Sequence, residues 1–351
     1  MTKVFGGEFF VEQDEMVNEP NFLVKVTCMT YNHANYITDA MDGFVMQQTS
    51  FPFVCIIIDD ASTDGEPGII KKYIDEYFDR LDIGLATEDE TDEYLRIYAR
   101  HKENKNCYFC VLLLKYNHYS IKKPKTNNLA GFAITRKYLA ICEGDDYWTD
   151  PLKLQKQVDF LEQHPEYSMC FHRVGVVGSD AKEFERFTRL AERDYSAKEI
   201  LENWTIPTAS VVYRPFAFEK NPVLGYGDIF MWLQLAEKGK LYCMGFLGGM
   251  YRRNENSVTY GFKLNNYVQL LKLYKFFKKR FPQLKETAEM MIDKQVYYIG
   301  NAQYQPGVLK YRLLHMLRHP KLLFSTYLTT TLFSYTPLRK LKFWKKNYKN
   351  R

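Results

Sequence analysis

Apolar runs and helical periodicities alternate along the first part of the chain and predict an α/β protein. Residues 24–28 form a strand-like run, and residues 53–58 form a continuous apolar run with β-branched residues, as expected for a strand covered on both faces. After each run, apolar residues recur at helical spacing, first over 36–45 and then over 69–77. Strand, helix, strand, helix at this spacing predicts a βαβ unit with a parallel sheet.

The same two signals continue to about residue 260. Further strands are predicted at 109–114, 138–142, 167–177 and 241–247, a loop followed by a strand within 205–214, and helices at 128–137, 151–163, from 196 onward and at 229–238. Residues 79–106 are charged and carry few strong core residues, so they are interpreted as an excursion of undetermined helical content. Beyond 260 the pattern is helical and basic. The predicted organisation is therefore an N-terminal extension (1–21), an α/β domain (22–260) and a basic helical C-terminal region (261–351).

Composition supports a folded protein without a membrane span. The chain has 351 residues, of which 46% are hydrophobic and 16% aromatic, which argues against disorder. The polar, acidic first residues show no signal-peptide pattern, and no run of 18 apolar residues occurs, so a transmembrane helix is not expected. Four cysteines lie inside apolar runs, which is typical of buried thiols in the cytoplasm: Cys28, Cys55, Cys142 and Cys170. The Cys107–Cys110 spacing has no second pair and is interpreted as accidental.

Charge is distributed unevenly along the chain. Residues 261–351 hold 19 Lys and Arg against 3 Asp and Glu, or +16, so the net charge of +6 leaves −10 on the first 260. Basic residues beside leucines and aromatic residues in this tail predict peripheral contact with an anionic membrane surface. The alternative is that the tail helices pack on the α/β domain with solvated lysines. Nucleic-acid binding is not expected of an acidic body.

Acidic side chains stand at the tips of three predicted elements. Glu143, Asp145 and Asp146 follow one strand, Asp59 and Asp60 follow another, and a further aspartate at position 228 opens a late helix. The carboxyl edge of such a sheet is where ligands bind, and clustered carboxylates suit Mg²⁺ or Mn²⁺. Neither glycine-rich phosphate motif is present. A nucleotide diphosphate would therefore be held through a metal.

Three segments together resemble the signature of family 2 glycosyltransferases with the GT-A fold. They are residues 26–32 (VTCMTYN), 57–64 (IIDDASTD) and 143–146 (EGDD), in the order and spacing of that family. The resemblance extends from about residue 22 to 260. It implies a Rossmann-like mixed, mostly parallel sheet flanked by helices.

The resemblance also assigns roles to individual positions. Thr30, Tyr31, Asn32 and Asp60 match residues that hold the base and ribose of a nucleotide-sugar donor, and Asp145 belongs to the same donor site. Asp145 and Asp146 match the ligands of Mn²⁺ or Mg²⁺ on the donor diphosphate, and Asp228 matches the catalytic base of inverting members. Residues 251–254 (YRRN) resemble a later Tyr-Arg segment, with Asn254 where relatives often have histidine. Glu143 stands where aspartate is frequent.

Structural roles compete with some of these assignments. Asp228 could be a helix N-cap, Asp59 is expected to support its turn, and Asp64 could cap the following helix. Tyr147 and Trp148 are interpreted as packing residues, and His33 and His172 as structural histidines.

The sequence therefore predicts an inverting, metal-dependent hexosyltransferase. It would transfer a sugar from a nucleotide donor, expected to be a UDP-sugar, to a saccharide or lipid-linked acceptor in bacterial surface polysaccharide or lipopolysaccharide biosynthesis. The expected location is the cytoplasm, with peripheral contact at the inner face of the membrane. Two alternatives remain open, a nucleotidyltransferase of similar fold and a non-catalytic carbohydrate-binding or scaffold protein.

Overall fold

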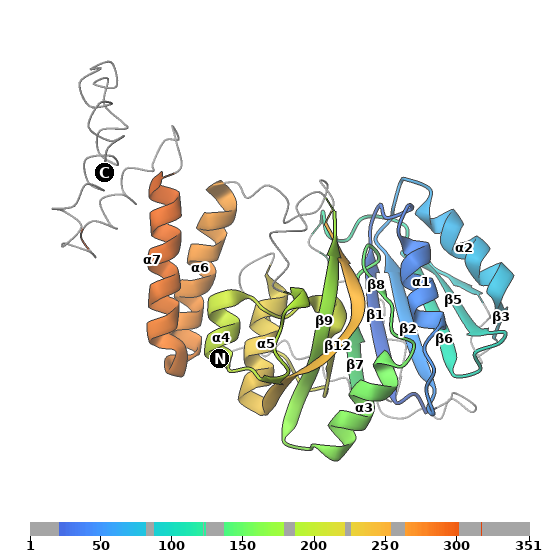
Figure 1. Cartoon of the computed structure of the whole chain (residues 1–351). Helices are drawn as coiled ribbons and strands as arrows, with labels where there is room; N and C mark the ends of the chain where they lie inside the picture. Colours follow the sequence, from blue (N-terminus) through green and yellow to red (C-terminus); the bar gives the residue numbers. More distant parts are fainter. Residues whose placement is uncertain are drawn as a thin grey trace, which may run out of the picture. The chain divides into compact units, whose positions relative to one another are not determined.

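The computed structural model describes residues 21–81, 88–121, 123, 137–178, 187–221, 226–253, 264–301 and 317. Residues 128–136 of the predicted helix at 128–137 lie outside the described residues, as do the N-terminal extension to residue 20 and nearly all of the chain after 301. The elements follow one another in this order (Figure 1): β1 (Val24–Thr30), α1 (Ile37–Val45), β2 (Phe53–Asp59), α2 (Glu66–Tyr77), β3 (Phe78–Arg80), β4 (Glu88–Glu90), β5 (Tyr94–His101), β6 (Cys107–Leu114), β7 (Tyr138–Ile141), β8 (Tyr147–Trp148), α3 (Lys153–Gln163), β9 (Tyr167–Val177), β10 (Arg193–Asp194), α4 (Ala197–Asn203), η3 (Thr208–Ser210), β11 (Val212–Tyr213), α5 (Gly227–Lys238), β12 (Lys240–Arg252), α6 (Leu264–Arg280), η4 (Pro282–Leu284) and α7 (Lys285–Asn301).

The strands of the described chain form one mixed sheet, as predicted. Its order is β10-β12-β9-β11-β7-β1-β2-β6-β5-β3, with β4 paired to β5 and β8 paired to β12. The four central strands, β7, β1, β2 and β6, are parallel, and they are flanked by β11 and β5, which pair antiparallel to β7 and β6. The carboxyl ends of β1, β2 and β7 therefore lie at one edge, where the predicted site residues are.

The core lies on both faces of the central strands. Along β2, Phe53, Cys55 and Ile57 face the apolar cluster that also contains residues of α1, α2 and α3. The alternate residues Val54 and Ile56 face a second cluster built from β5 and β6. Figure 1 shows α1 and α2 lying side by side against the sheet. A strand buried on both faces must be apolar at every position, and β2 confirms the prediction made from its sequence.

Two segments differ from the prediction. The excursion predicted at 79–106 contains β3, β4 and β5, and Leu95, Ile97 and Ala99 of β5 are buried. Arg96 and Arg100 interrupt the apolar pattern of β5, so the pattern does not predict this strand. Pairing with β6 stabilises β5. The last predicted strand is also longer than 241–247, because β12 continues beside β9 to Arg252.

All seven cysteines are free and buried. Cys107 faces the first apolar cluster and Cys110 the second, so the two thiols point to opposite faces of β6. The interpretation of their spacing as accidental is thereby confirmed.

Helices α6 and α7 belong to a second compact unit. They form a helical pair connected by η4, as the helical pattern after residue 260 predicts. Their packed sides carry buried residues such as Leu273, Phe277 and Val296, whereas Lys272 and Lys275 are exposed. Within the described parts of the chain, no helix has the length and apolar character needed to cross a bilayer.

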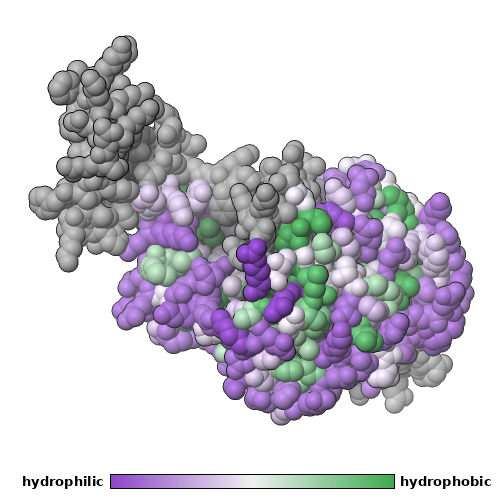
Figure 2. Space-filling view, in the orientation of Figure 1, coloured by the Kyte–Doolittle hydropathy of each residue, from purple (hydrophilic) through white to green (hydrophobic). Residues whose placement is uncertain are grey.

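The surface of the described chain is mainly polar. Figure 2 shows hydrophilic residues over most of one face, with apolar residues in smaller patches among them. Large apolar side chains with high exposure include Tyr119 (67%) and Leu247 (51%). Isolated exposure of this kind is ordinary in soluble domains.

One lysine is buried in the core beneath α3. The Lys153 side chain is fully buried, its Nζ has no hydrogen-bond partner, and it lies 3.9 Å from the centroid of the Trp148 ring. Burial lowers the pKa of Lys153 to about 7, and the ionisable groups that act on it are the thiols of Cys142, Cys170 and Cys55. With no carboxylate among these groups, the charged form of Lys153 is disfavoured in the folded protein.

We expect Lys153→Met to raise the free energy of unfolding at pH 7 by on the order of 1–3 kcal/mol, because methionine fills the space without a buried charge. Above about pH 7 the unfolded chain keeps a proton on Lys153 that the folded chain has lost. The free energy of unfolding of the wild type should therefore rise between pH 7 and 10. The amount by which the wild type is less stable than the variant should decrease over the same range. Urea unfolding at pH 6, 7 and 9 measures this, with the exposed Lys72→Met as control. A deficit that stays constant over this range would contradict the prediction.

Candidate functional site

The loops after β1 and β2 are joined by hydrogen bonds. The Asn32 backbone N–H donates to Ser62 Oγ at 2.8 Å, and the Thr63 N–H donates to Asn32 Oδ1 at 2.8 Å. The Asp60 N–H donates to the Thr30 carbonyl oxygen at 3.0 Å. Asn32 has a φ of 56°, a left-handed conformation that asparagine tolerates. Three of the predicted donor-binding residues, Thr30, Asn32 and Asp60, are thus brought together.

Two of the predicted donor-binding side chains, Tyr31 and Asp60, differ in accessibility. Tyr31, in the loop after β1, is 43% exposed, which leaves its ring open to a ligand. Asp60 is buried, and its carboxylate accepts the backbone N–H groups of His118 (2.7 Å) and Tyr119 (3.2 Å). Asp60 therefore also holds the turn that follows β6. Contact between Asp60 and a donor ribose stays a prediction.

Asp59 supports its turn, as expected from the sequence. Its Oδ2 accepts the Ser62 N–H at 3.1 Å, and burial raises the pKa of Asp59 to about 6. Asp64 contacts both loops, because its two carboxylate oxygens accept the N–H groups of Ala34 and Glu66 at 2.9 and 3.1 Å.

Glu66, at the start of α2, is a central residue of the contact between the loops after β1 and β2. Sequence reasoning missed it. It is fully buried, and its carboxylate accepts hydrogen bonds from Thr30 Oγ1, from Ser62 Oγ at 2.8 Å and from the His33 N–H at 2.9 Å. An acidic residue in the first turn of a helix is an ordinary sequence feature. No local pattern predicts that this one reaches the loop after β1.

The acidic loop between β7 and β8 is held by the end of β12. The Arg252 backbone N–H donates to Asp146 Oδ1 at 2.8 Å, and Arg252 Nη1 donates to the Asp145 carbonyl oxygen at 2.8 Å. The same guanidinium donates to Asp39 Oδ2 at 2.7 Å, and its carbon lies 4.9 Å from the centroid of the Tyr147 ring. The Tyr-Arg segment identified in the sequence therefore positions the predicted metal ligands.

Close packing places this acidic loop against the loop after β1. Gly144 lies so near Thr30 that any side chain at position 144 would collide with the Thr30 hydroxyl. Trp148 is buried and donates from Nε1 to the Ala209 carbonyl oxygen at 2.7 Å. Its role is packing, as the sequence analysis proposed.

Burial and nearby carboxylate charges raise the pKa values of two residues of the acidic loop. Burial, followed by the nearby charge of Asp145, raises the pKa of Glu143 to about 7 and raises that of Asp146 well above its usual range. The charge of Asp228 also acts on Glu143. Asp228, at the start of α5, therefore lies within electrostatic reach of the acidic loop.

The electrostatics of Asp228 differ from the expectation for a helix N-terminus. Hydrogen bonding to the backbone N–H of Ile229 favours the ionised form, but burial is the larger effect and raises the pKa of Asp228. Burial therefore outweighs the lowering of the Asp228 pKa that a helix N-terminus favours. A carboxylate with a raised pKa is a better proton acceptor near neutral pH.

Asp145 and Asp146 are adjacent in the acidic loop, but their role as metal ligands stays a prediction. Among the described residues, no group of three or more His, Cys, Asp or Glu side chains is arranged to hold a metal. The fit of the loop to a cation rests instead on its chemistry, because three carboxylates there share one partly buried region and two have strongly raised pKa values. A positive charge would relieve that repulsion.

Comparison with known proteins identifies the family. Residues 26–223, more than half of the chain, match the family model described as glycosyl transferase family 2. The chain belongs to glycosyl transferase family 2. The matched region contains the joined loops and the acidic loop, and the predicted enzyme class, a glycosyltransferase of the GT-A type, is thereby confirmed.

Relatives of this glycosyltransferase occur in several bacteria. The uncharacterized protein Rv1520 of Mycobacterium tuberculosis (strain H37Rv) is 31% identical over 280 residues, covering 77% of this chain and 68% of the relative. TuaG of Bacillus subtilis, which its name assigns to teichuronic acid biosynthesis, is 23% identical over 241 residues, covering 68% of this chain and 81% of TuaG.

Solved structures of glycosyltransferases are also similar to the chain. Staphylococcus aureus TarS 1–349 in complex with UDP-GlcNAc has a TM-score of 0.47 at 15% identity, covering 93% of this chain and 78% of TarS. The Pyrobaculum calidifontis mannosyltransferase PcManGT, in complex with GDP-Man and Mn²⁺, has a TM-score of 0.46 at 14% identity. The match covers 91% of this chain and 85% of PcManGT.

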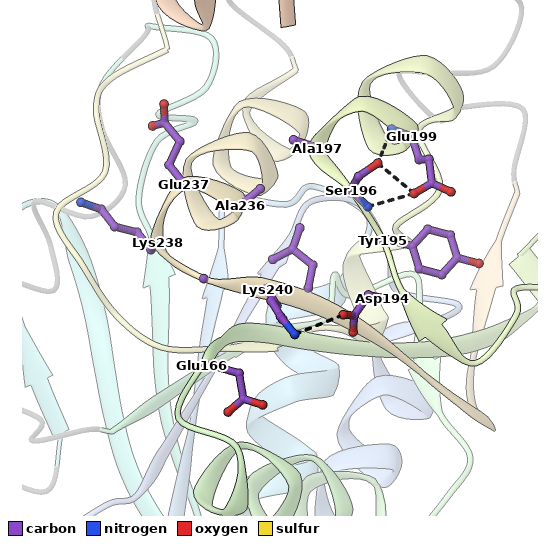
Figure 3. Close-up of a pocket in the computed structure, with 12 residues that line it drawn as sticks. Glu166, Asp194, Tyr195, Ser196, Ala197, Glu199, Ala236, Glu237, Lys238 and Lys240 are labelled. Carbon is purple, nitrogen blue, oxygen red and sulfur yellow. Dashed lines mark hydrogen bonds and ion pairs between the residues drawn. The ribbon is translucent and has the colours of Figure 1, made fainter. Parts of the chain in front are cut away.

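The glycosyltransferase also has a pocket of about 560 Å³ far from the acidic loop. It is lined where β9 and β12 begin and where α5 ends, and Figure 3 shows Lys240 directed toward Asp194, 3.7 Å away. The acidic loop contacts the opposite end of β12, at Arg252. This pocket is therefore separate from the candidate donor site.

In this glycosyltransferase, Glu66→Ala is expected to lower the free energy of unfolding by about 2–3 kcal/mol, because the buried Thr30 hydroxyl and the partly buried Ser62 hydroxyl lose their acceptor. Urea unfolding measures this effect, with the exposed Glu76→Ala as control. A stability change within about 0.5 kcal/mol, as for an ordinary surface substitution, would show that Glu66 does not stabilise the contact between the loops after β1 and β2.

Proposed function

We propose that this family 2 glycosyltransferase is an inverting, metal-dependent enzyme that uses a nucleotide-sugar donor, and that the donor is a UDP-sugar. The observation that carries the proposal is the convergence of distant acidic residues. The loops after β1 and β2 are hydrogen-bonded to each other, Gly144 of the acidic loop packs on Thr30, and the charge of Asp228 acts on Glu143. These segments are far apart in sequence and share one region of the fold.

Asp228 is proposed as the catalytic base. The hydroxyl of an acceptor sugar is a poor nucleophile and needs a proton acceptor within hydrogen-bond reach. The raised pKa of Asp228 suits that role, and its position at a helix start fixes the carboxylate by a backbone hydrogen bond. A single base without a covalent nucleophile leads to inversion at the anomeric carbon.

Asp145 and Asp146 are proposed to hold Mn²⁺ or Mg²⁺ together with the donor diphosphate. Such an ion, when bound, offsets the negative charge that develops on the leaving nucleoside diphosphate. Arg252 contributes by holding the loop, through one hydrogen bond to the Asp146 carboxylate and one to the Asp145 carbonyl. Thr30, Tyr31, Asn32 and Asp60 would bind the nucleoside.

The acceptor is proposed to be a saccharide or lipid-linked saccharide in bacterial surface polysaccharide biosynthesis. The name of TuaG, which refers to teichuronic acid, supports a polysaccharide product. The strongly basic region from residue 261 supports peripheral contact with an anionic membrane at its cytoplasmic face. Helix α6, with exposed lysines and no acidic residue, agrees with this charge distribution.

Donor hydrolysis tests the proposal without knowledge of the acceptor. The purified protein should release UDP slowly from at least one UDP-sugar in a panel, and this release should require Mn²⁺ or Mg²⁺. The panel should include GDP-sugars, because the class of sugar nucleotide that is hydrolysed shows whether the donor carries UDP or GDP. Release of pyrophosphate from a nucleoside triphosphate would instead identify a nucleotidyltransferase. If no donor is hydrolysed and UDP with Mn²⁺ causes no thermal shift, the non-catalytic alternative holds.

A further inference from the structure

The imidazole of His33 lies between the joined loops and the acidic loop. Its Nδ1 is 3.2 Å from Thr30 Oγ1, and its Nε2 is 3.8 Å from Asp145 Oδ2. The His33 N–H donates to Glu66, and the ring is 6.4 Å from the Tyr36 ring, centroid to centroid. The ring is therefore held at its backbone and at Nδ1, with Nε2 directed at the acidic loop.

The hydrogen bonds of Thr30 determine which ring nitrogen carries the proton. The Thr30 hydroxyl has one hydrogen, and it donates this hydrogen to the Glu66 carboxylate. Thr30 Oγ1 can then only accept from His33, so Nδ1 is protonated in the neutral imidazole. Nε2 consequently presents its lone pair to Asp145.

Two electron-pair donors thus face each other across 3.8 Å, on side chains that are only partly covered (22% exposed for His33 and 18% for Asp145). Neutral imidazole nitrogen and carboxylate oxygen are both metal ligands. Two adjacent ligands of an octahedral Mg²⁺ or Mn²⁺ ion lie about 3 Å apart. The observed separation of 3.8 Å is close to this value.

We propose that His33 Nε2 is a ligand of the divalent cation held by the acidic loop. This inference rests on the proposed metal-dependent function and adds a nitrogen ligand from the loop after β1. Glu66 and Thr30 are then positioning residues that fix the tautomer, as the partner of a metal-bound histidine commonly does. Through His33 the cation connects the loop that carries Thr30 and Asn32 with the acidic loop. An imidazole ligand also favours Mn²⁺ over the harder Mg²⁺, which prefers oxygen.

The direct test is electron spin echo spectroscopy of Mn²⁺ bound to the full-length protein with UDP. The wild type should show ¹⁴N modulation from a coordinated imidazole. His33→Gln should lose this modulation, and its Mn²⁺ affinity in the presence of UDP should fall by at least about tenfold. Its preference for Mn²⁺ over Mg²⁺ should also decrease. The control is His164→Gln, which removes a 44%-exposed histidine outside the site and should leave both signals unchanged.

The wild-type spectrum alone can overturn the proposal, even if His33→Gln folds poorly. Mn²⁺ bound with UDP but without ¹⁴N modulation would overturn the role of His33 and leave the proposed function intact. Modulation that persists in His33→Gln would likewise overturn it. If the wild type binds no Mn²⁺ with UDP, the proposed function itself fails, and the ligand role with it.

Discussion

Asp228→Asn is expected to lower the rate of donor hydrolysis by about 10²- to 10⁴-fold, the usual contribution of a general base. Asparagine has the size of aspartate and keeps an oxygen that can accept the Ile229 N–H, so the start of α5 should be preserved. It cannot accept a proton from the attacking hydroxyl. Donor binding should remain, because Asp228 is not assigned to the nucleotide or the metal. The effect should therefore appear in kcat and leave KM for the donor unchanged.

The matched control for this variant is Glu237→Gln. Glu237 is exposed near the other end of α5, at the pocket where β9 and β12 begin. The Glu237→Gln variant has the same change of carboxylate to amide on the same helix. Its rate of donor hydrolysis should equal that of the wild type. Normal hydrolysis by Asp228→Asn would show that the base lies elsewhere.

Asp146→Asn is expected to abolish metal-dependent binding of UDP and to lower donor hydrolysis by roughly 10³-fold, since a bound cation contributes several kcal/mol to such reactions. The asparagine oxygen can still accept the Arg252 N–H, which the wild-type carboxylate binds at 2.8 Å. The loop should therefore keep its shape while its negative charge decreases. Removing a buried charge of raised pKa should also leave the variant at least as stable as the wild type.

Calorimetric titration of UDP with and without Mn²⁺ measures this effect. Asp159→Asn, an exposed position on α3, makes the same chemical change outside the site and should behave as the wild type. Equal enhancement of UDP binding by Mn²⁺ in Asp146→Asn and the wild type would remove Asp146 from the metal site.

Local signals were sufficient to predict the central fold. The apolar run of β2 and the helical spacing of α1 are properties of consecutive residues, and both elements occur where they were predicted. Ser196 forms the capping box of α4 with Glu199, as expected for a helix that starts near Ser196. Strand β5 was missed because its arginines interrupt the apolar pattern, and its pairing with β6 depends on tertiary structure.

The sequence proposed the candidate site residues, but it did not predict the contacts that support them. Asp145, Asp146 and Asp228 were proposed from motifs, which are local, whereas Glu66 and Arg252 make contacts over long sequence distances. Arg252 reaches Asp146 only because β12 continues beside β9 to its last residue. His33 was interpreted as structural, although its Nε2 lies 3.8 Å from Asp145. Such contacts depend on strand register and loop packing, which no periodicity encodes.

An anomalous-scattering map of crystals grown with Mn²⁺ and UDP tests the central claim most directly. We predict one manganese peak between the UDP diphosphate and the carboxylates of Asp145 and Asp146, with Asp228 facing the same cavity. A map with UDP bound elsewhere, or with manganese away from the acidic loop, would contradict the account.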